Sequence, residues 1–303
     1  MVPQPKLSLR SRFFRAVWKR MTSRTASFAT PQEMNASMER WLNWPILARG
    51  VSRQEVVAGG VPAEWLTPVA DAGRGVLLYV HGGAWTLGYY EPHRWLVSHM
   101  ARATGRRALA IDYRLAPEHP FPAALEDCLA AYRWLLTTGI AAEQIVMGGD
   151  SAGGNLTLAT MLALRDNGEP LPAAGVCLSP ATDLAGTGEA PPSQEDVGLP
   201  LDWANEQVRL YLGDADPRLP LVSPHYADLH GLPPLLIQVG GDEWLRHDAQ
   251  RFVPRALAAG VEVTLQVWPG MWHVWQILVP FLPEASQAVK AIGEFCRQQG
   301  ARL

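Results

Sequence analysis

The chain has 303 residues, of which 48% are hydrophobic and 18% are charged, and its formal net charge is −3. This length allows one large domain or two small ones, and the composition excludes a disordered or fibrous chain. The small negative charge gives no electrostatic basis for nucleic acid as the main partner. The three cysteines are widely spaced, so neither a disulfide framework nor a CxxC metal or redox site is expected, and a reducing compartment fits best.

The first 48 residues predict a helical segment ahead of the main fold. Residues 12–21 place aromatic and aliphatic side chains at helical spacing among cations, and residues 31–44 form a second helical stretch. Two interpretations of the first helix stay open: it packs its aromatic face onto the domain, which we favour, or it is amphipathic and touches anionic lipid. No run reaches the roughly 18 to 20 apolar residues of a membrane span. The basic start lacks the pattern of a secretory signal, so we expect a cytoplasmic location.

From residue 49 onward, short apolar strands alternate with helical segments. Strands are predicted at 76–80, 107–111, 145–148, 176–178, 235–239 and 263–267. Helices are predicted at 95–104, 123–137, 155–167, 249–259 and 284–297. This alternation predicts an α/β fold with a mostly parallel sheet covered by helices on both faces. Functional groups in such folds gather where the strands end.

Residues 183–222 interrupt the alternation. No strand is predicted there, and a stretch rich in Gly, Pro and acidic residues precedes a helical segment at 203–212. A loop of this length is typical of a lid or binding insertion. We therefore expect a helical cap segment at 1–48, an α/β core in two parts at 49–182 and 223–303, and a cap insertion at 183–222.

The segment Gly149-Asp150-Ser151-Ala152-Gly153 follows an apolar strand and precedes a helix with apolar periodicity. A serine on such a sharp turn points its hydroxyl outward, and the flanking glycines avoid a clash across the turn. The pattern predicts Ser151 as a nucleophile. The alternative is a structural glycine turn with an incidental serine.

The sequence His81-Gly82-Gly83-Ala84-Trp85 follows the first predicted strand of the core. Glycine-rich backbone at this place can direct N–H groups at a developing oxyanion. We expect the donors to be Gly82 and Gly83, joined by Ala152, the residue after the nucleophile. His81 ends a buried strand and is expected to support the loop rather than act as the base.

A serine nucleophile needs a base and an orienting carboxylate, expected in the order serine, acid, histidine. Asp242 is the first acid after the fifth predicted strand of the core, and we prefer it to its competitors Glu243 and Asp248. His273 follows the sixth strand and a Pro-Gly turn, and it is the predicted base. The histidines at 225, 230 and 247 lie in or beside loops without such a strand.

Three motifs together resemble the bacterial hormone-sensitive lipase-like esterases (family IV, GDSAG type) of the α/β-hydrolase superfamily. They are HGGAW at 81–85, DYRLAPEHPFPAA at 112–124 and GDSAGGN at 149–155. The resemblance runs from about residue 76 to the C-terminus. It implies the α/β-hydrolase fold, the triad of Ser151, Asp242 and His273, and a cap built from the N-terminus and the insertion after Pro180.

Ala84 stands where the family's usual HGGG motif has its last glycine. Its methyl group leaves the N–H in place but narrows the space beside it, so we expect retained catalysis with a restricted acyl or alcohol pocket. Trp85 and Trp272 flank the proposed oxyanion loop and base, and they suggest an aromatic wall of the substrate pocket.

The sequence thus predicts a serine carboxylic-ester hydrolase that acts on short to medium acyl esters through a covalent acyl-enzyme. A lactonase, arylformamidase or amidase stays open, because the same triad serves all of them. A noncatalytic small-molecule receptor is less expected, because His273 is present and the plant gibberellin receptors that resemble this family lose it. No metal or cofactor is expected, since His and Cys show no ligand spacing. The expected partners are a small ester and, from the resemblance, a second copy of the chain.

Overall fold

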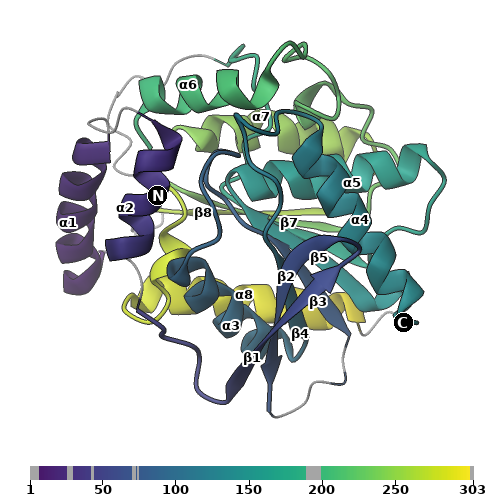
Figure 1. The fold of residues 1–303 in the computed structure, drawn as a ribbon, viewed down its shortest axis with the longest axis horizontal. Helices are drawn as coiled ribbons and strands as arrows, with labels where there is room; N and C mark the ends of the chain where they lie inside the picture. Colours follow the sequence, from purple (N-terminus) through teal and green to yellow (C-terminus); the bar gives the residue numbers. More distant parts are fainter. Residues whose placement is uncertain are drawn as a thin grey trace.

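The protein is seen here as a computed structural model that describes residues 7–25, 30–41, 44–69, 73, 75–188 and 199–300. An eight-stranded sheet lies at its centre, with helices on both faces (Figure 1). The strands are β1(Val51–Ala58), β2(Val61–Pro68), β3(Val76–Val80), β4(Arg107–Ile111), β5(Ile145–Asp150), β6(Ala174–Leu178), β7(Leu235–Gly240) and β8(Val263–Trp268). Their spatial order is β1-β2-β4-β3-β5-β6-β7-β8. The six strands from β3 to β8 pair in parallel, and β1 and β2 join in antiparallel pairs.

The central strands are apolar at nearly every position because both faces of the sheet are covered. Successive side chains point to opposite faces, so Leu78 and Val80 enter one hydrophobic core while Leu77 and Tyr79 enter the other. Helices α4(Ala123–Thr137), α5(Ala152–Asp166) and α7(Leu245–Ala258) cover the first face. Helices α3(Glu91–Thr104) and α8(Pro283–Gly300) cover the second. The expected α/β-hydrolase architecture is confirmed.

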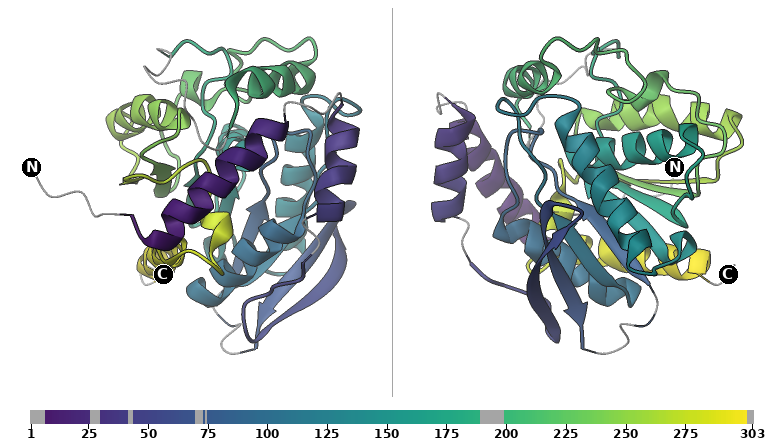
Figure 2. Two further views of the ribbon diagram at one scale, coloured as in Figure 1. Left: turned by 90° about the vertical axis from the view of Figure 1, so that its left-hand side faces the viewer. Right: turned by 45° about the vertical axis from the view of Figure 1, so that its right-hand side comes forward.

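Three further helices lie beyond the sheet, at the edge where its parallel strands end. They are α1(Leu9–Thr25), α2(Pro31–Trp41) and α6(Leu201–Leu212). Figure 2 shows α1 with its first turn near α8, where Glu284 accepts hydrogen bonds from the N–H and hydroxyl of Ser8. Short 3₁₀ helices complete the fold as η1(Ala142–Gln144), η2(Pro224–Tyr226) and η3(Trp275–Leu278). Among the described helices, none is both long and apolar enough to cross a bilayer.

The hairpin of β1 and β2 is the element that the sequence analysis did not predict. β1 is an edge strand with mostly exposed side chains, and Val57 is 63% exposed, so the strand lacks the apolar run of the central strands. The turn at Gly59 and Gly60 has positive φ at both residues, as tight hairpin turns require. The Gly-Gly pair was the available signal for this hairpin.

Candidate active site

Ser151 lies in the sharp turn between β5 and α5. Its φ of 53° and ψ of −117° are unusual for a residue with a side chain, and its N–H donates to the carbonyl oxygen of Leu178 at 2.8 Å. A Cβ on Gly149 would collide with the backbone of Gly153, and one on Gly153 would collide with the carbonyl oxygen of Val80. Small residues are therefore required on both sides of the serine.

His273 joins two side chains into one hydrogen-bonded series. Its Nε2 lies 2.9 Å from the Oγ of Ser151, and its Nδ1 lies 2.7 Å from Oε2 of Glu243. The other carboxylate oxygen of Glu243 accepts the hydroxyl of Ser179 at 2.7 Å and the N–H of Gly240 at 2.5 Å. All three members of the series are buried. The acid is thus fixed by three hydrogen bonds, and it orients the imidazole toward the serine.

The expected acid, Asp242, does not contact His273, and this expectation is corrected. Its side chain is 38% exposed and pairs with Arg15 of α1. The cause is the turn after β7: the N–H of Asp242 donates to the carbonyl oxygen of Met271 at 2.9 Å, and a Cβ on Gly240 would meet the same carbonyl. This close packing against the base loop directs Asp242 outward and leaves the next residue, Glu243, to reach inward.

Asp248, the other competitor, has a different task. Its Oδ2 accepts the N–H groups of Thr182 at 2.9 Å and Asp183 at 3.1 Å. Burial raises the pKa of Asp248 to about 6. The residue therefore anchors the chain after β6 to α7.

His81 supports the loop after β3, as expected. Its Nδ1 lies 2.6 Å from the carbonyl oxygen of Gly82, and its ring stacks on Tyr113 with centroids 4.2 Å apart. Burial lowers the pKa of His81 to about 3, which keeps the imidazole neutral at ordinary pH.

The backbone donors near Ser151 differ from the expected set in one position. The N–H of Gly82 donates to Oδ1 of Asp150 at 3.0 Å, so it is already engaged, and Gly82 does not line the cavity described below. Gly83 and Ala84 do line it. Within the described part of the chain, no acceptor is found for the N–H groups of Gly83, Ala84 and Ala152. The expectation that the Gly82 N–H is available as a donor is therefore corrected, and Ala84, whose φ is 51°, is the next residue of the turn after Gly83 with an N–H in this region.

A cavity of about 760 Å³ opens above these groups. Ser151 and His273 lie in its wall together with Gly83 and Ala84. Most of the remaining wall is apolar, and the outer helices and η3 contribute to it with Phe14, Trp18, Met34, Trp203, Val208 and Ile277. The site thus combines a polar reacting end with a largely apolar chamber, as small-molecule sites commonly do.

The two tryptophans expected at the pocket lie in different places. Trp85 lines the cavity and stacks on Tyr211 of α6, with centroids 4.5 Å apart. Trp272 is fully buried in the core beneath α8 and does not line the cavity, so its proposed role in the pocket is corrected. It precedes His273 in the loop, and the two neighbouring side chains point to different sides of the backbone.

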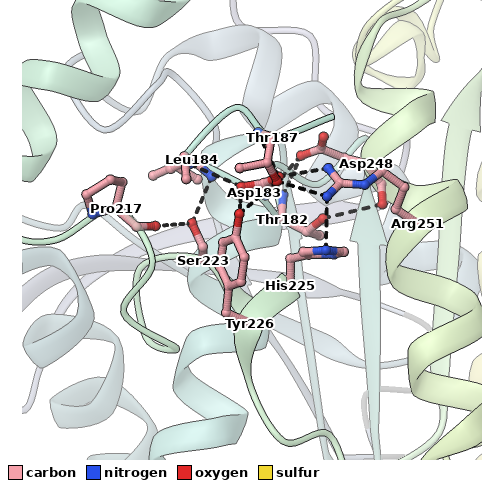
Figure 3. A network of polar contacts seen from close by, with 11 residues as sticks. Thr182, Asp183, Leu184, Thr187, Pro217, Ser223, His225, Tyr226, Asp248 and Arg251 are labelled. Carbon is pink, nitrogen blue, oxygen red and sulfur yellow. Dashed lines mark hydrogen bonds and ion pairs between the residues drawn. The ribbon is translucent and has the colours of Figure 1, made fainter. Parts of the chain in front are cut away.

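A polar network fixes one wall of the cavity (Figure 3). Asp183 accepts hydrogen bonds from Arg251 at 2.7 Å, Tyr226 at 2.9 Å and the hydroxyl of Thr187 at 2.7 Å. Burial opposes ionisation of Asp183, but these donors outweigh it and lower the pKa of the carboxyl. The network ties the start of the 183–222 segment to α7.

No group of three His, Cys, Asp or Glu side chains suited to a metal ion occurs among the residues that are described.

Sequence reasoning missed Arg15 as a site neighbour. Its Nη1 donates to Asp242 and, at 2.9 Å, to the carbonyl oxygen of Gly270. The arginine therefore connects α1 to the loops that carry Glu243 and His273. No local motif could have identified it, because its two acceptors lie more than 220 residues further along the chain.

Comparisons with known proteins agree with this geometry. The family model described as "alpha/beta hydrolase fold" matches residues 77–277. An "Acetyl-hydrolase" of Streptomyces hygroscopicus is 47% identical over 244 residues, covering 80% of this chain and 81% of that protein. An "Esterase" of Acinetobacter venetianus is 34% identical over 297 residues, covering 93% and 97%.

A solved esterase structure is also similar to this chain in both fold and sequence. The crystal structure of "an esterase from the bacterial hormone-sensitive lipase (HSL) family" is 45% identical, with a TM-score of 0.91, and the match covers 97% of this chain and 99% of that one. With the family model, the relatives and the serine–histidine–carboxylate geometry in agreement, the chain belongs to the α/β-hydrolase family as a carboxylic-ester hydrolase of the bacterial hormone-sensitive lipase type.

Proposed function

We propose that Ser151, His273 and Glu243 form the catalytic triad of this esterase and that the reaction proceeds through an acyl-enzyme on Ser151. The observation that carries this proposal is the single imidazole that hydrogen-bonds both the serine hydroxyl and a buried carboxylate. A serine hydroxyl is a weak nucleophile until a neighbouring base accepts its proton. His273 has this position, and Glu243 stabilises the imidazolium that forms.

In the first half of the reaction, Oγ of Ser151 attacks the ester carbonyl carbon while Nε2 of His273 accepts the hydroxyl proton. The carbonyl oxygen becomes negatively charged and receives hydrogen bonds from the N–H groups of Gly83, Ala84 and Ala152. The C–O bond to the alcohol then breaks, and His273 gives its proton to the leaving alkoxide. In the second half, His273 deprotonates a water molecule as it attacks the acyl carbon; the bond from this carbon to Oγ of Ser151 then breaks, His273 returns the proton to Oγ, and the acid is released.

We propose that the substrates carry short to medium acyl chains. The cavity of about 760 Å³ must hold both the acyl and the alcohol parts, and Ala84 and Trp85 line it together with Ser151. A series of p-nitrophenyl esters with two to sixteen acyl carbons tests this proposal. A maximum of kcat/KM at the longest chain would contradict it. Lactones and anilides in the same panel distinguish the lactonase and amidase alternatives.

The outer helices are proposed to act as the cap, with residues 1–48 and 183–222 as its two parts. Support comes from α1, α2 and α6, which all contribute side chains to the cavity wall.

We also propose a cytoplasmic setting, which the three buried free thiols suit. Pairing of two copies is a proposal from the family resemblance, and light scattering on the purified protein tests it.

The decisive experiment labels the nucleophile covalently. Incubation with an organophosphate ester that mimics the tetrahedral intermediate should add one phosphoryl group per chain, and peptide mapping should place it on Ser151. The Ser151→Ala variant is the matched control and should stay unlabelled. Labelling at any other residue, or full ester turnover by the variant, would overturn the proposal.

A further inference from the structure

Helix α1 has two unlike faces. The inner face packs on the domain: Ser11 donates to Glu284 at 2.6 Å, Phe14 stacks on Phe281 with centroids 5.7 Å apart, and Arg15 pairs with Asp242. These residues follow helical spacing, so one stripe of the helix accounts for its attachment. The attachment leaves the opposite side of α1 facing solvent.

That outer face carries a second apolar stripe. Leu9 is 81% exposed, Phe13 is 64% exposed and Val17 is 37% exposed, and the three recur at every fourth residue. Successive fourth residues lie on the same side of a helix. A helix whose only task is to pack on its own domain needs one apolar stripe, whereas an exposed second stripe marks an interaction surface.

Cations surround this stripe. Arg10, Arg12, Lys19 and Arg20 are exposed, and α1 contains no acidic residue although the whole chain has a net charge of −3. At 100° per residue, Arg20 falls within the apolar stripe and the other three fall to either side of it. Apolar side chains bordered by cations are the pattern of helices that lie in the surface of an anionic bilayer. Charge complementarity therefore selects an anionic lipid surface as the occupant.

The outer face also borders the cavity. Val17 and Trp44 are both partly exposed and both line the cavity, and Trp44 is 67% exposed. Side chains that are exposed and also line a cavity lie at its rim. Tryptophan at such a place suits the boundary between lipid and water.

We propose that the outer face of α1, defined by Leu9, Phe13, Val17 and the flanking cations, docks with Trp44 on an anionic lipid surface and brings the cavity rim against the lipid. Ester substrates dissolved in that surface then enter the cavity without crossing bulk water. Docking itself does not depend on catalysis, and only the delivery of substrate rests on the proposed function.

Co-sedimentation of the full chain with vesicles tests the docking. Vesicles of phosphatidylcholine alone are compared with an equimolar mixture of phosphatidylcholine and phosphatidylglycerol at low and high NaCl. We expect binding at least about tenfold stronger to the anionic vesicles, weakened by salt because screening reduces the attraction. The Ser151→Ala variant should bind as the wild type does, which separates docking from the catalytic proposal.

The Leu9→Ser/Phe13→Ser double variant removes apolar side chains that do not line the cavity. It should lose about tenfold or more in vesicle binding while hydrolysis of a soluble p-nitrophenyl ester is unchanged, which also shows that it folds. Leu257→Ser, which alters an exposed leucine on α7, is the matched control and should bind like the wild type.

Two outcomes would overturn the proposal. The first is equal binding to both kinds of vesicle or equal binding by the double variant and the wild type. The second is a concentration-dependent dimer that the double variant abolishes, since the outer face would then be an interface between two copies of the chain.

Discussion

The reacting end of the cavity, which carries Ser151, His273 and Glu243, and its helical roof, which consists of α1, α2 and α6, are held in place by different kinds of contact. At the reacting end, Glu243 and His273 come from loops at the ends of neighbouring strands. Each polar atom that the proposed mechanism uses is held by a hydrogen bond or by the backbone turn that contains it. In the roof, α1 is attached by a few side-chain contacts and presents apolar groups to the cavity. The difference implies that substitutions at the reacting end change the rate of the chemistry, whereas substitutions in the roof change which esters are accepted.

The largest expected effect is at Ser151. Replacing it by Ala removes the nucleophile, and kcat for p-nitrophenyl esters should fall by about 10⁶-fold, with a residual rate that the backbone donors provide. Steady-state kinetics on freshly purified variant measures it. A decrease in kcat smaller than about tenfold would mean that the reacting end does not control the rate of the chemistry as proposed.

The polar network that ties the start of the 183–222 segment to α7 should affect the pH dependence of stability. The pKa of Asp248 in the folded chain is about 6, whereas an unfolded Asp titrates near about 3.9. Because the folded value is raised, the ionised form is disfavoured in the folded state, and stability from this group falls as pH rises from about 4 to about 6.

Asp248→Asn keeps an oxygen for the N–H groups of Thr182 and Asp183 but cannot ionise. The free energy of unfolding of this variant, minus that of the wild type, should therefore increase by on the order of 2 kcal/mol between pH 4 and pH 7. Urea unfolding across this range provides the measurement. Parallel pH profiles for the two proteins would contradict the assignment.

In the roof, Phe14→Ala should alter selection. Phe14 lines the cavity, so its loss removes apolar contact with the longer esters, and kcat/KM for an octanoyl ester should fall by about tenfold while the acetyl ester changes less than about twofold. Phe13→Ala is the matched control because Phe13 is the next residue on the helix, is exposed and does not line the cavity. Equal decreases in kcat/KM for the octanoyl and acetyl esters would show that Phe14 does not influence which acyl chains are accepted.

The smallest effect is expected at Ala84. Gly in its place should relieve a backbone φ of 51° and remove a methyl group beside the serine. We expect a gain of up to about 1 kcal/mol in stability from the backbone, partly offset by the greater freedom of glycine in the unfolded chain. Activity on esters of bulky acids should rise by a few fold. Thermal unfolding and the kinetics of a pivaloyl ester check the two parts, and a slower variant would argue against a restricted pocket.

The sheet and the place of the site could be predicted from the sequence because both depend on local patterns. Buried parallel strands leave continuous apolar runs, and Ser151 directly follows such a run in β5, whereas His273 lies in the loop after the less buried edge strand β8. The hairpin of β1 and β2 left only a Gly-Gly turn signal, because its first strand lies at the edge of the sheet and has mostly exposed side chains.

The finer assignments depended on contacts between distant segments. Asp242 and Glu243 are adjacent in sequence, and only the packing of their turn on the base loop decides which one points inward. Gly82 is excluded as a donor by the carboxylate of Asp150, which lies 68 residues away. Trp272 points into the core beneath α8. Sequence spacing carries no information on such directions.

Kinetics of Glu243→Gln and Asp242→Asn on one soluble ester decide which carboxylate serves as the acid of the triad. Both changes replace a carboxylate by an amide of the same shape, and they lie at neighbouring positions. Because Glu243 contacts His273, we expect kcat to fall by about 10⁴-fold for Glu243→Gln and by less than about tenfold for Asp242→Asn, whose partner is Arg15. The reverse ranking would show that Glu243 is not the acid of the triad.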